Sequence, residues 1–405
     1  MTPRRPRILY LCPAWPHGPA HGGQLRALHI GRALQRVGDV TLLVAGDDPG
    51  SEATRRKTAA EFNLAPPIRS RPAPNRGLGQ KLRWAFDPRY LNVHGAAVSE
   101  ADRQRLLRDA REHDLVWVMN ARTPSALQIW AWPRTHLDID DIPSAYLKAA
   151  GDTAVHWTTR WKTRAQHLLQ RRREQRFRDR FTTLSVCSEA DRTYLGGERV
   201  HVIPNGFARP SVEPARTPSA HAPRLGFIGL YSYAPNLDGV RWFLREVWPA
   251  LRRAVPGVRF RLVGQDTTGP LRPADRGVDA LGWLGDPAEE IATWSAMVVP
   301  IRFGGGTRIK LADAFSRKCP VVSTAFGAHG YGVASGRQLL LADSGANFAA
   351  ACIALLRDPA RGRQLADSAW TDFLQHWSWE AIQPKISAAV EDCLRRSPAV
   401  AASTP

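Results

Sequence analysis

Apolar and polar residues alternate along this chain in two different periods. Residues 7–11 (RILYL) form a short apolar run, apolar positions then recur at roughly helical spacing from Gly23 to Val37, and residues 40–45 (VTLLVA) form a second short run. Short apolar runs separated by helical patterns are typical of βαβ units in a parallel sheet. The opening of the chain is therefore predicted to be a strand, a helix that begins near Gly23, and a second strand.

The same alternation returns in the second half of the chain. Residues 224–228 read as a strand that ends at Gly229, and residues 240–251 carry apolar positions at helical spacing before another strand pattern at 259–264. Residues 210–223 contain four prolines and separate the two halves, as an interdomain linker does. A length of 405 residues suits two or three domains. The pattern predicts an α/β protein with two Rossmann-like, doubly wound domains.

Composition narrows the class of protein. No apolar run is long enough to span a membrane, and the first run reads as a strand rather than as a signal peptide. Five scattered cysteines without a CxxC pair favour buried free thiols over disulfides or a zinc site. We therefore expect a cytoplasmic protein.

The chain carries a formal net charge of +19, which implies an anionic partner or surface. Nucleic acid, anionic lipid and a nucleotide-sugar all qualify, and a genomic bias toward arginine is a further source of the charge. Much of it lies in residues 157–181, a basic helical segment with Trp157 and Trp161 at one end. Such a helix can lie on an anionic leaflet. The alternative, which we favour at this stage, is a solvated face whose few apolar residues pack on the domain.

Residues 296–324 combine a buried strand, the glycines Gly304 to Gly306, a helix with Arg308 and Lys310 in its first turn, and a second buried strand. A glycine-rich turn before a helix N-terminus presents unpaired N–H groups and a dipole that favours anions. Two cations stand at the end of a helix that disfavours them, and an anionic ligand would explain this. A turn with solvated basic residues is the alternative, but the basic pair favours phosphate.

Acidic residues end another predicted strand, residues 135–141 (THLDIDD). Ligands of α/β proteins bind at the carboxyl ends of strands. Asp140 or Asp141 can orient a hydroxyl group of such a ligand or serve as a general base. The alternative for Asp141 is the N-cap of a helix that starts near Pro143.

The stretch 304–324 (GGGTRIKLADAFSRKCPVVST) resembles the C-terminal signature of family 4 glycosyltransferases of the GT-B fold. It is most similar to the branch with a GGGTR-x-K motif that is found in surface polysaccharide biosynthesis. Residues 188–207 (SEADR…VHVIPNGF) and 226–264 resemble the same branch, so the matches recur in order over both halves of the chain.

The resemblance implies two Rossmann-like domains facing across a cleft. Its boundaries are an acceptor-side domain at 1–209, the linker at 210–223, a nucleotide-sugar domain at 224–375, closing helices at 376–396 that cross back to the first domain, and a disordered tail at 397–405.

The resemblance also implies an activity. It is transfer of a sugar from a UDP- or GDP-linked donor to a saccharide, lipid-linked or small-molecule acceptor, with retention, without metal or other cofactor, and without nucleic acid as a partner. A peripheral position on the inner face of an anionic membrane would suit such an acceptor.

The resemblance assigns site residues as well. Catalysis is expected to involve Asp140, Arg308 and Lys310, and donor binding is expected to involve Gly22, Gly23, Gly229, Asn236, Trp283, Leu284, Gly304, Gly305, Gly306, Thr307, Arg308, Lys310 and Asp313.

The chain departs from the family pattern in two places. Residues 230–236 lack the arginine and lysine that many relatives use to hold the diphosphate, which leaves that task to Arg308 and Lys310. Many relatives also carry two glutamates separated by seven residues. In this chain Gly305 stands at the first of these positions and Asp313 at the second. Asp313 can accept hydrogen bonds from a ribose or pair locally with Arg317.

Two other classes of function stay open at this point. One is a GT-B epimerase that acts on a nucleotide-sugar, and the other is a non-catalytic basic module that binds nucleic acid or anionic lipid.

Overall fold

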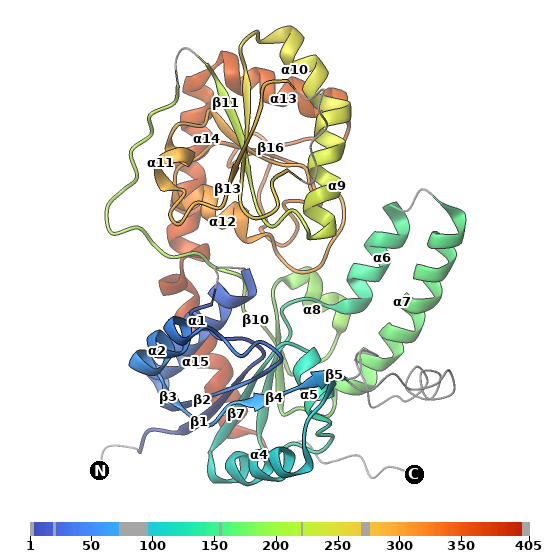
Figure 1. Cartoon of the computed structure of the whole chain (residues 1–405), viewed down its shortest axis with the longest axis vertical. Coiled ribbons are helices and arrows are strands. Elements are labelled where there is room, and N and C mark those ends of the chain that lie inside the picture. Colours follow the sequence, from blue (N-terminus) through green and yellow to red (C-terminus); the bar gives the residue numbers. More distant parts are fainter. Residues whose placement is uncertain are drawn as a thin grey trace. The chain divides into compact units, whose positions relative to one another are not determined.

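The computed structural model describes residues 4–18, 22–72, 96–153, 156–219, 222–268 and 276–398 (Figure 1). The chain divides into two compact units, one formed by Met1–Pro204 with Gln383–Pro405 and the other by Asn205–Ile382. Each unit contains one large parallel sheet with helices packed around it. The predicted α/β class with two Rossmann-like parts is confirmed. Of the predicted tail, residues 399–405 lie outside the described residues.

The sheet of the first unit has the strand order β10-β9-β8-β7-β1-β2-β3, with β4 also paired to β2, and every pair is parallel. Its strands read as short apolar runs because they are buried on both faces, as all five residues of β7 are. The strands are β1 (Arg7–Cys12), β2 (Asp39–Gly46), β3 (Asn63–Leu64), β4 (Ile68–Arg69), β7 (Leu115–Met119), β8 (Thr135–Asp138), β9 (Thr183–Val186) and β10 (Val200–Val202). A separate antiparallel pair joins β5 (Arg71–Pro72) and β6 (Ala96–Ala97).

Helices connect these strands, and serines begin several of them. The Ser188 hydroxyl accepts a hydrogen bond from the Asp191 amide and so caps α8. The helices are α1 (Gly22–Val37), α2 (Glu52–Glu61), α4 (Glu100–Glu112), α5 (Arg122–Leu127), α6 (Pro143–Thr153), α7 (Trp157–Arg178) and α8 (Glu189–Leu195).

The sheet of the second unit has the order β13-β12-β11-β14-β15-β16 and is parallel throughout. Its strands are β11 (Arg224–Ile228), β12 (Arg259–Val263), β13 (Val278–Gly282), β14 (Ala296–Val299), β15 (Val321–Ser323) and β16 (Leu340–Leu341). Its helices are α9 (Ala234–Trp242), α10 (Trp248–Ala254), α11 (Ala288–Ala292), α12 (Ile309–Ser316), α13 (Gly345–Arg357) and α14 (Pro359–Asp372), with the π-helical stretches η1 (Phe243–Val247) and η2 (Phe373–Trp377).

The last helix, α15 (Trp379–Arg395), starts in the second unit, and its residues from Gln383 onward group with the first. Within the first unit, the Gln383 amide donates to the Ala33 carbonyl at 3.1 Å and Asp392 pairs with His201 at 3.0 Å. The helix is thus anchored to the first unit by polar contacts as well as by its buried side chains.

The strand order reverses once in each sheet. In the first unit β1 leads to β2 and β3 on one side, whereas β7, β8, β9 and β10 continue on the other. In the second unit β11 leads to β12 and β13, whereas β14, β15 and β16 continue on the opposite side. The carboxyl ends of the two strands at such a reversal are where open α/β sheets bind ligands.

Two local predictions need correction. The strand predicted at 135–141 ends at Asp138, so Asp140 and Asp141 follow it. The helix predicted at 157–181 ends at Arg178, and Trp157 and Trp161 are exposed rather than packed on the domain. Within the described residues, no helix combines the length and apolar character needed to cross a bilayer.

Candidate functional site

The glycine run forms the turn between β14 and α12. Gly304 has φ of +146° and Gly306 has φ of +58°, which are backbone conformations that a side chain disfavours. α12 begins at Ile309, so Arg308 is its N-cap residue with extended backbone rather than a member of its first turn. The reason is that the turn must be completed before helical hydrogen bonding can start.

Arg308 lies buried against this turn with hydrogen-bonding capacity left over. Its Nη1 donates to the Gly305 carbonyl, while its Nε and Nη2 and the hydroxyl of Thr307 are buried without a hydrogen-bond partner among the described residues. The guanidinium carbon lies 5.3 Å from the centre of the Phe326 ring. Buried donors are almost always satisfied in proteins, so these three atoms indicate the place of a ligand with acceptor oxygens.

Lys310 faces the same region from the first turn of α12. Its Nζ donates to the Asn236 Oδ1 at 2.7 Å and lies 4.0 Å from the centre of the Phe227 ring. The Asn236 amide in turn donates to the Leu230 carbonyl at 2.8 Å. Burial, and next the charge of Arg308, hold the pKa of Lys310 well below its ordinary value.

Gly229 follows β11 directly, and its lack of a side chain leaves room for the Asn236 amide and the Lys310 ammonium group. A Cβ at this position would lie 2.8 Å from the Asn236 Nδ2 and 3.5 Å from the Lys310 Nζ. Gly229 and Asn236 therefore come together with Lys310, as the prediction of one donor site requires. All of these residues follow β11 or β14, the two strands at which the sheet order reverses.

Arg308 and Lys310 bind a carbonyl and an amide oxygen, whereas two neighbouring arginines pair with carboxylates. Nearby, Arg302 pairs with Asp238 at 2.7 Å and Arg317 pairs with Asp313 at 2.5 Å. Burial raises the pKa of the Asp313 carboxyl, and Arg317 opposes that shift. Asp313 thus forms the local pair that the sequence offers as one alternative, and a ribose contact stays a prediction.

Trp283 and Leu284 follow β13 at the edge of the sheet, two strands from β11. The Trp283 side chain is 50% exposed and Leu284 packs on the core of the second unit. The structure therefore offers an exposed indole here, and its predicted role toward the donor base stays a prediction.

Three predicted residues belong to the first unit. Gly22 and Gly23 open α1, after β1, and Gly23 has open space where a side chain would lie. Asp140 follows β8 and is half-buried, and its carboxylate accepts a hydrogen bond from the Cys187 thiol at 3.3 Å. The strands concerned end on the side of the sheet where ligands bind.

Sequence reasoning missed Arg26, which is fully buried on α1. Its Nε and Nη2 donate to both carboxylate oxygens of Asp138 at 2.9 and 2.6 Å, and its Nη2 also reaches the Ile203 carbonyl at 3.0 Å. Ser185 donates to the same carboxylate at 2.6 Å. Asp138 therefore acts as a structural ion, and the available signal was an arginine among the apolar positions of a predicted helix.

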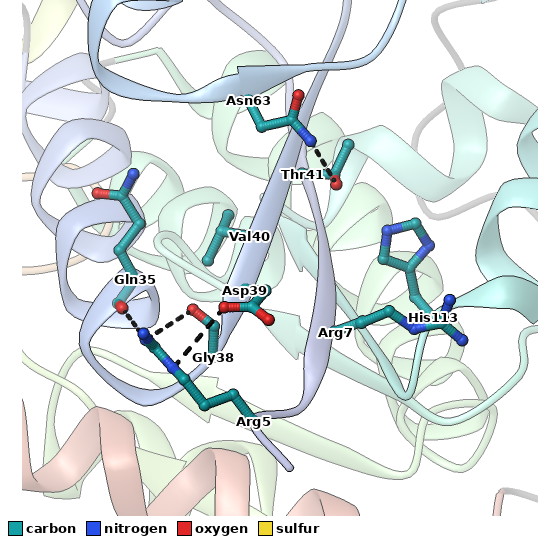
Figure 2. Close-up of a pocket in the computed structure, with 9 residues that line it drawn as sticks. All are labelled: Arg5, Arg7, Gln35, Gly38, Asp39, Val40, Thr41, Asn63 and His113. Carbon is teal, nitrogen blue, oxygen red and sulfur yellow. Dashed lines mark hydrogen bonds and ion pairs between the residues drawn. The ribbon is translucent and has the colours of Figure 1, made fainter.

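A shallow pocket of about 540 Å³ lies at the opposite, amino-terminal ends of β1 and β2 (Figure 2). Figure 2 shows Arg5 turned toward Gln35, Gly38 and Asp39, which accept its hydrogen bonds or pair with it. None of the predicted site residues lines this pocket. Of its two arginines, Arg5 is already engaged, and the pocket shares no residue with the glycine turn that precedes α12. No group of three or more metal-ligating side chains is found within the part of the chain that the structure describes.

Comparisons with known proteins bear on the class of protein. Residues 222–358 match the family model described as "Glycosyl transferases group 1". The chain is also 25% identical, over 159 residues, to an uncharacterized 44.6 kDa protein in the cps region of Klebsiella pneumoniae. That alignment covers 37% of this chain and 41% of the relative, so the chain matches less than half of that protein's length.

Solved structures resemble the whole chain. Sucrose-phosphate synthase of Thermosynechococcus elongatus superposes with a TM-score of 0.65 at 15% identity, covering 96% of this chain and 98% of that one. HepE of Anabaena, solved with UDP and glucose, superposes with a TM-score of 0.66 at 17% identity, covering 95% and 99%. The chain therefore has the GT-B fold, its second unit carries the match to the glycosyltransferase model, and the fold prediction is confirmed. Membership of family 4 and of its GGGTR-x-K branch stays a prediction.

Proposed function

We propose that the protein transfers a sugar from a nucleoside diphosphate sugar, UDP- or GDP-linked, to a saccharide, lipid-linked or small-molecule acceptor, with retention and without metal. One observation carries the proposal. Arg308 is buried beside Lys310, and two of its nitrogens have no hydrogen-bond partner among the residues that the structure describes, at the strand reversal of the domain that matches the group 1 glycosyltransferase model.

The chemistry assigned to this group is electrostatic. Negative charge grows on the diphosphate as the bond to the sugar breaks, and donors fixed in advance stabilise that charge without reorganising. The Nε and Nη2 of Arg308 present a planar fork that matches phosphate oxygens, and Lys310 adds a point charge. The burial of Arg308 and the partial burial of Lys310 strengthen these interactions over those in water.

Asp140 is assigned to the acceptor, as a group that orients or deprotonates its hydroxyl. Its place after β8 and its partial burial support that role. Gly22 and Gly23 would let the acceptor or donor approach the start of α1, because neither has a side chain.

The relatives support a UDP-linked donor and a saccharide product. HepE was solved with UDP and glucose, and the Klebsiella relative lies in a cps region. We assign the protein to the cytoplasm, in peripheral contact with the inner face of a membrane. Five buried free cysteines support a reducing compartment.

The test begins with thermal unfolding of the full chain in UDP, GDP, ADP and TDP and their sugars, each with EDTA and with Mg²⁺. We expect one nucleotide series to raise the Tm equally in both conditions. The stabilising sugar is then incubated with saccharide acceptors, and nucleotide release that depends on an acceptor separates a transferase from an epimerase. The anomeric proton coupling of the product reports retention. No stabilisation by any nucleotide at millimolar concentration contradicts the proposal.

A further inference from the structure

α6 and α7 form a helical hairpin that extends from the sheet of the first unit (Figure 1). One side of α7 holds the two helices together. Gly151 lets α7 approach, since a Cβ there would lie 2.6 Å from the Thr163 hydroxyl. The His167 ring lies 3.0 Å from the Ser144 carbonyl, and Glu174 accepts a hydrogen bond from the Ser144 amide at 2.8 Å.

The opposite side of α7 is apolar and exposed. Seven large apolar side chains are exposed among the described residues, and four of them are on α7. The side chains of Trp157, Trp161 and Leu168 are 77%, 73% and 61% exposed. Successive residues of a helix are about 100° apart, so these three fall within an arc of about 40°, about 120° from the side that packs on α6. Apolar stripes of this kind mark interaction sites.

Cations border the stripe on both sides. By the same geometry Arg164 and Arg172 each lie about 40° from its centre, and both are exposed. α7 contains eight lysine and arginine residues and a single acid, Glu174, which is buried against Ser144. On α6, the charges of Lys148 and Asp152 cancel. The exposed surface of α7 is therefore an apolar line between positive charges.

An apolar line flanked by cations favours one kind of binding partner over others. A second copy of the hairpin would bring like charges together. A nucleic acid would use the arginines and could stack on the tryptophans, but it would leave Leu168 in water. An anionic bilayer satisfies every group, because tryptophan and leucine enter the interface while long cationic side chains reach lipid phosphates.

We propose that the α6–α7 hairpin docks the protein on an anionic bilayer, with Trp157, Trp161 and Leu168 in the headgroup region and Arg164 and Arg172 on lipid phosphates. The contact runs along α7, whose 22 residues span about 33 Å. This inference specifies the proposed membrane contact by its residues, and it does not depend on the sugar-transfer chemistry.

The test is cosedimentation of the full chain with phosphatidylcholine vesicles that contain either no anionic lipid or about 30% phosphatidylglycerol, in about 0.15 M salt. We expect binding to the anionic vesicles and at least tenfold weaker binding to the neutral ones. The double variant Arg164→Gln/Arg172→Gln should bind the anionic vesicles about 30-fold more weakly, on the usual contribution of each cation near such a surface. The double variant Trp157→Ser/Trp161→Ser should lose at least tenfold.

The matched control is Arg252→Gln/Arg253→Gln, which removes two exposed charges from α10 and should bind as the wild type does. Circular dichroism and the Tm verify that each variant folds. Equal loss in the control, equal binding to neutral vesicles, or binding of an oligonucleotide in place of vesicles would overturn the proposal.

The UDP-induced rise in Tm, measured on the same variants, separates the two proposals. Hairpin variants that lose vesicle binding but keep the UDP response support docking by α7 alone. Vesicle binding without any nucleotide response would support the docking and contradict only the transferase assignment.

Discussion

Replacing Arg308 with alanine tests the anion site directly. The substitution removes two buried donor nitrogens, Nε and Nη2, that have no hydrogen-bond partner within the described part of the chain. A charge-assisted hydrogen bond contributes roughly 1.5–3 kcal/mol to binding. If the diphosphate engages at least one of these groups, Arg308→Ala weakens UDP binding by that amount, which is a factor of about 10 to 150 in Kd.

Isothermal titration of UDP into the full chain, in EDTA at neutral pH, measures this loss. Arg302→Ala is the matched control, because it removes the same charge from the same β14–α12 connection. The two nitrogens of Arg302 that face Asp238 are already engaged, at 3.0 and 2.7 Å. We expect its Kd to stay within about twofold of the wild type.

Arg308→Lys adds a second comparison. It keeps the charge but loses the planar fork, so its affinity should lie between those of the wild type and of Arg308→Ala. If Arg308→Ala retains wild-type affinity, or if Arg302→Ala loses as much, the assignment of Arg308 to the diphosphate is wrong. Because the Nη1 of Arg308 also holds the Gly305 carbonyl, the Tm of each variant must be measured alongside.

Three further predictions concern buried charges. Burial and Arg308 lower the pKa of Lys310, and a bound diphosphate would raise it. UDP binding should therefore take up a proton, and it should weaken as pH rises through the pKa that Lys310 has in the unliganded protein. Calorimetric titration in buffers of different ionisation enthalpy measures the proton uptake. Burial raises the pKa of the Glu174 carboxyl to about 7 from an ordinary 4.5, so its contribution to stability is complete below about pH 4.5 and is lost as pH rises through about 7. In urea unfolding, Glu174→Gln should therefore match the wild type near pH 4.5 and exceed it by up to about 3 kcal/mol at about pH 8. Arg26→Met leaves Asp138 buried without its partner and should lower the free energy of unfolding by about 3–5 kcal/mol.

Each of these has a control. Lys310→Met should bind UDP without proton uptake, and uptake that persists in this variant would contradict the role of Lys310. Glu112→Gln, an exposed carboxylate on α4, should show no stabilisation that grows with pH, and a Glu174→Gln effect that is equal at both pH values would contradict burial as its cause. The double variant Arg26→Met/Asp138→Asn should lose less than the sum of its single variants, whereas simple additivity would mean that the two ions do not couple.

Much of the fold was predictable from short stretches of sequence. The strands predicted at residues 7–11 and 40–45 agree with β1 and β2 to within one residue at each end, because burial and periodicity are set by neighbouring residues. The strand predicted at 135–141 was too long, since alternating Asp and Ile continue its pattern past the point where pairing ends.

The candidate site was predictable only in part. The glycine turn and its two cations could be found in sequence because they lie within seven residues of one another, from Gly304 to Lys310. The distinction between Arg308, two of whose nitrogens find no partner in the described part of the chain, and Arg317, paired with Asp313, required the structure. Charge alone does not reveal which cation is already neutralised.

The sequence by itself determined the α/β alternation, the two Rossmann-like parts and the place of the glycine turn before α12, because turn chemistry and periodicity act over a few residues. Only the tertiary structure decided which distant groups meet. Lys310 reaches Asn236 across 74 positions of the chain, and Arg26 reaches Asp138 across 112. It also decided which side of α7 faces water, since a helix of arginines and tryptophans can bury either face until its partner α6 is in place. Such pairings depend on the order of strands in the sheet, which local sequence does not encode.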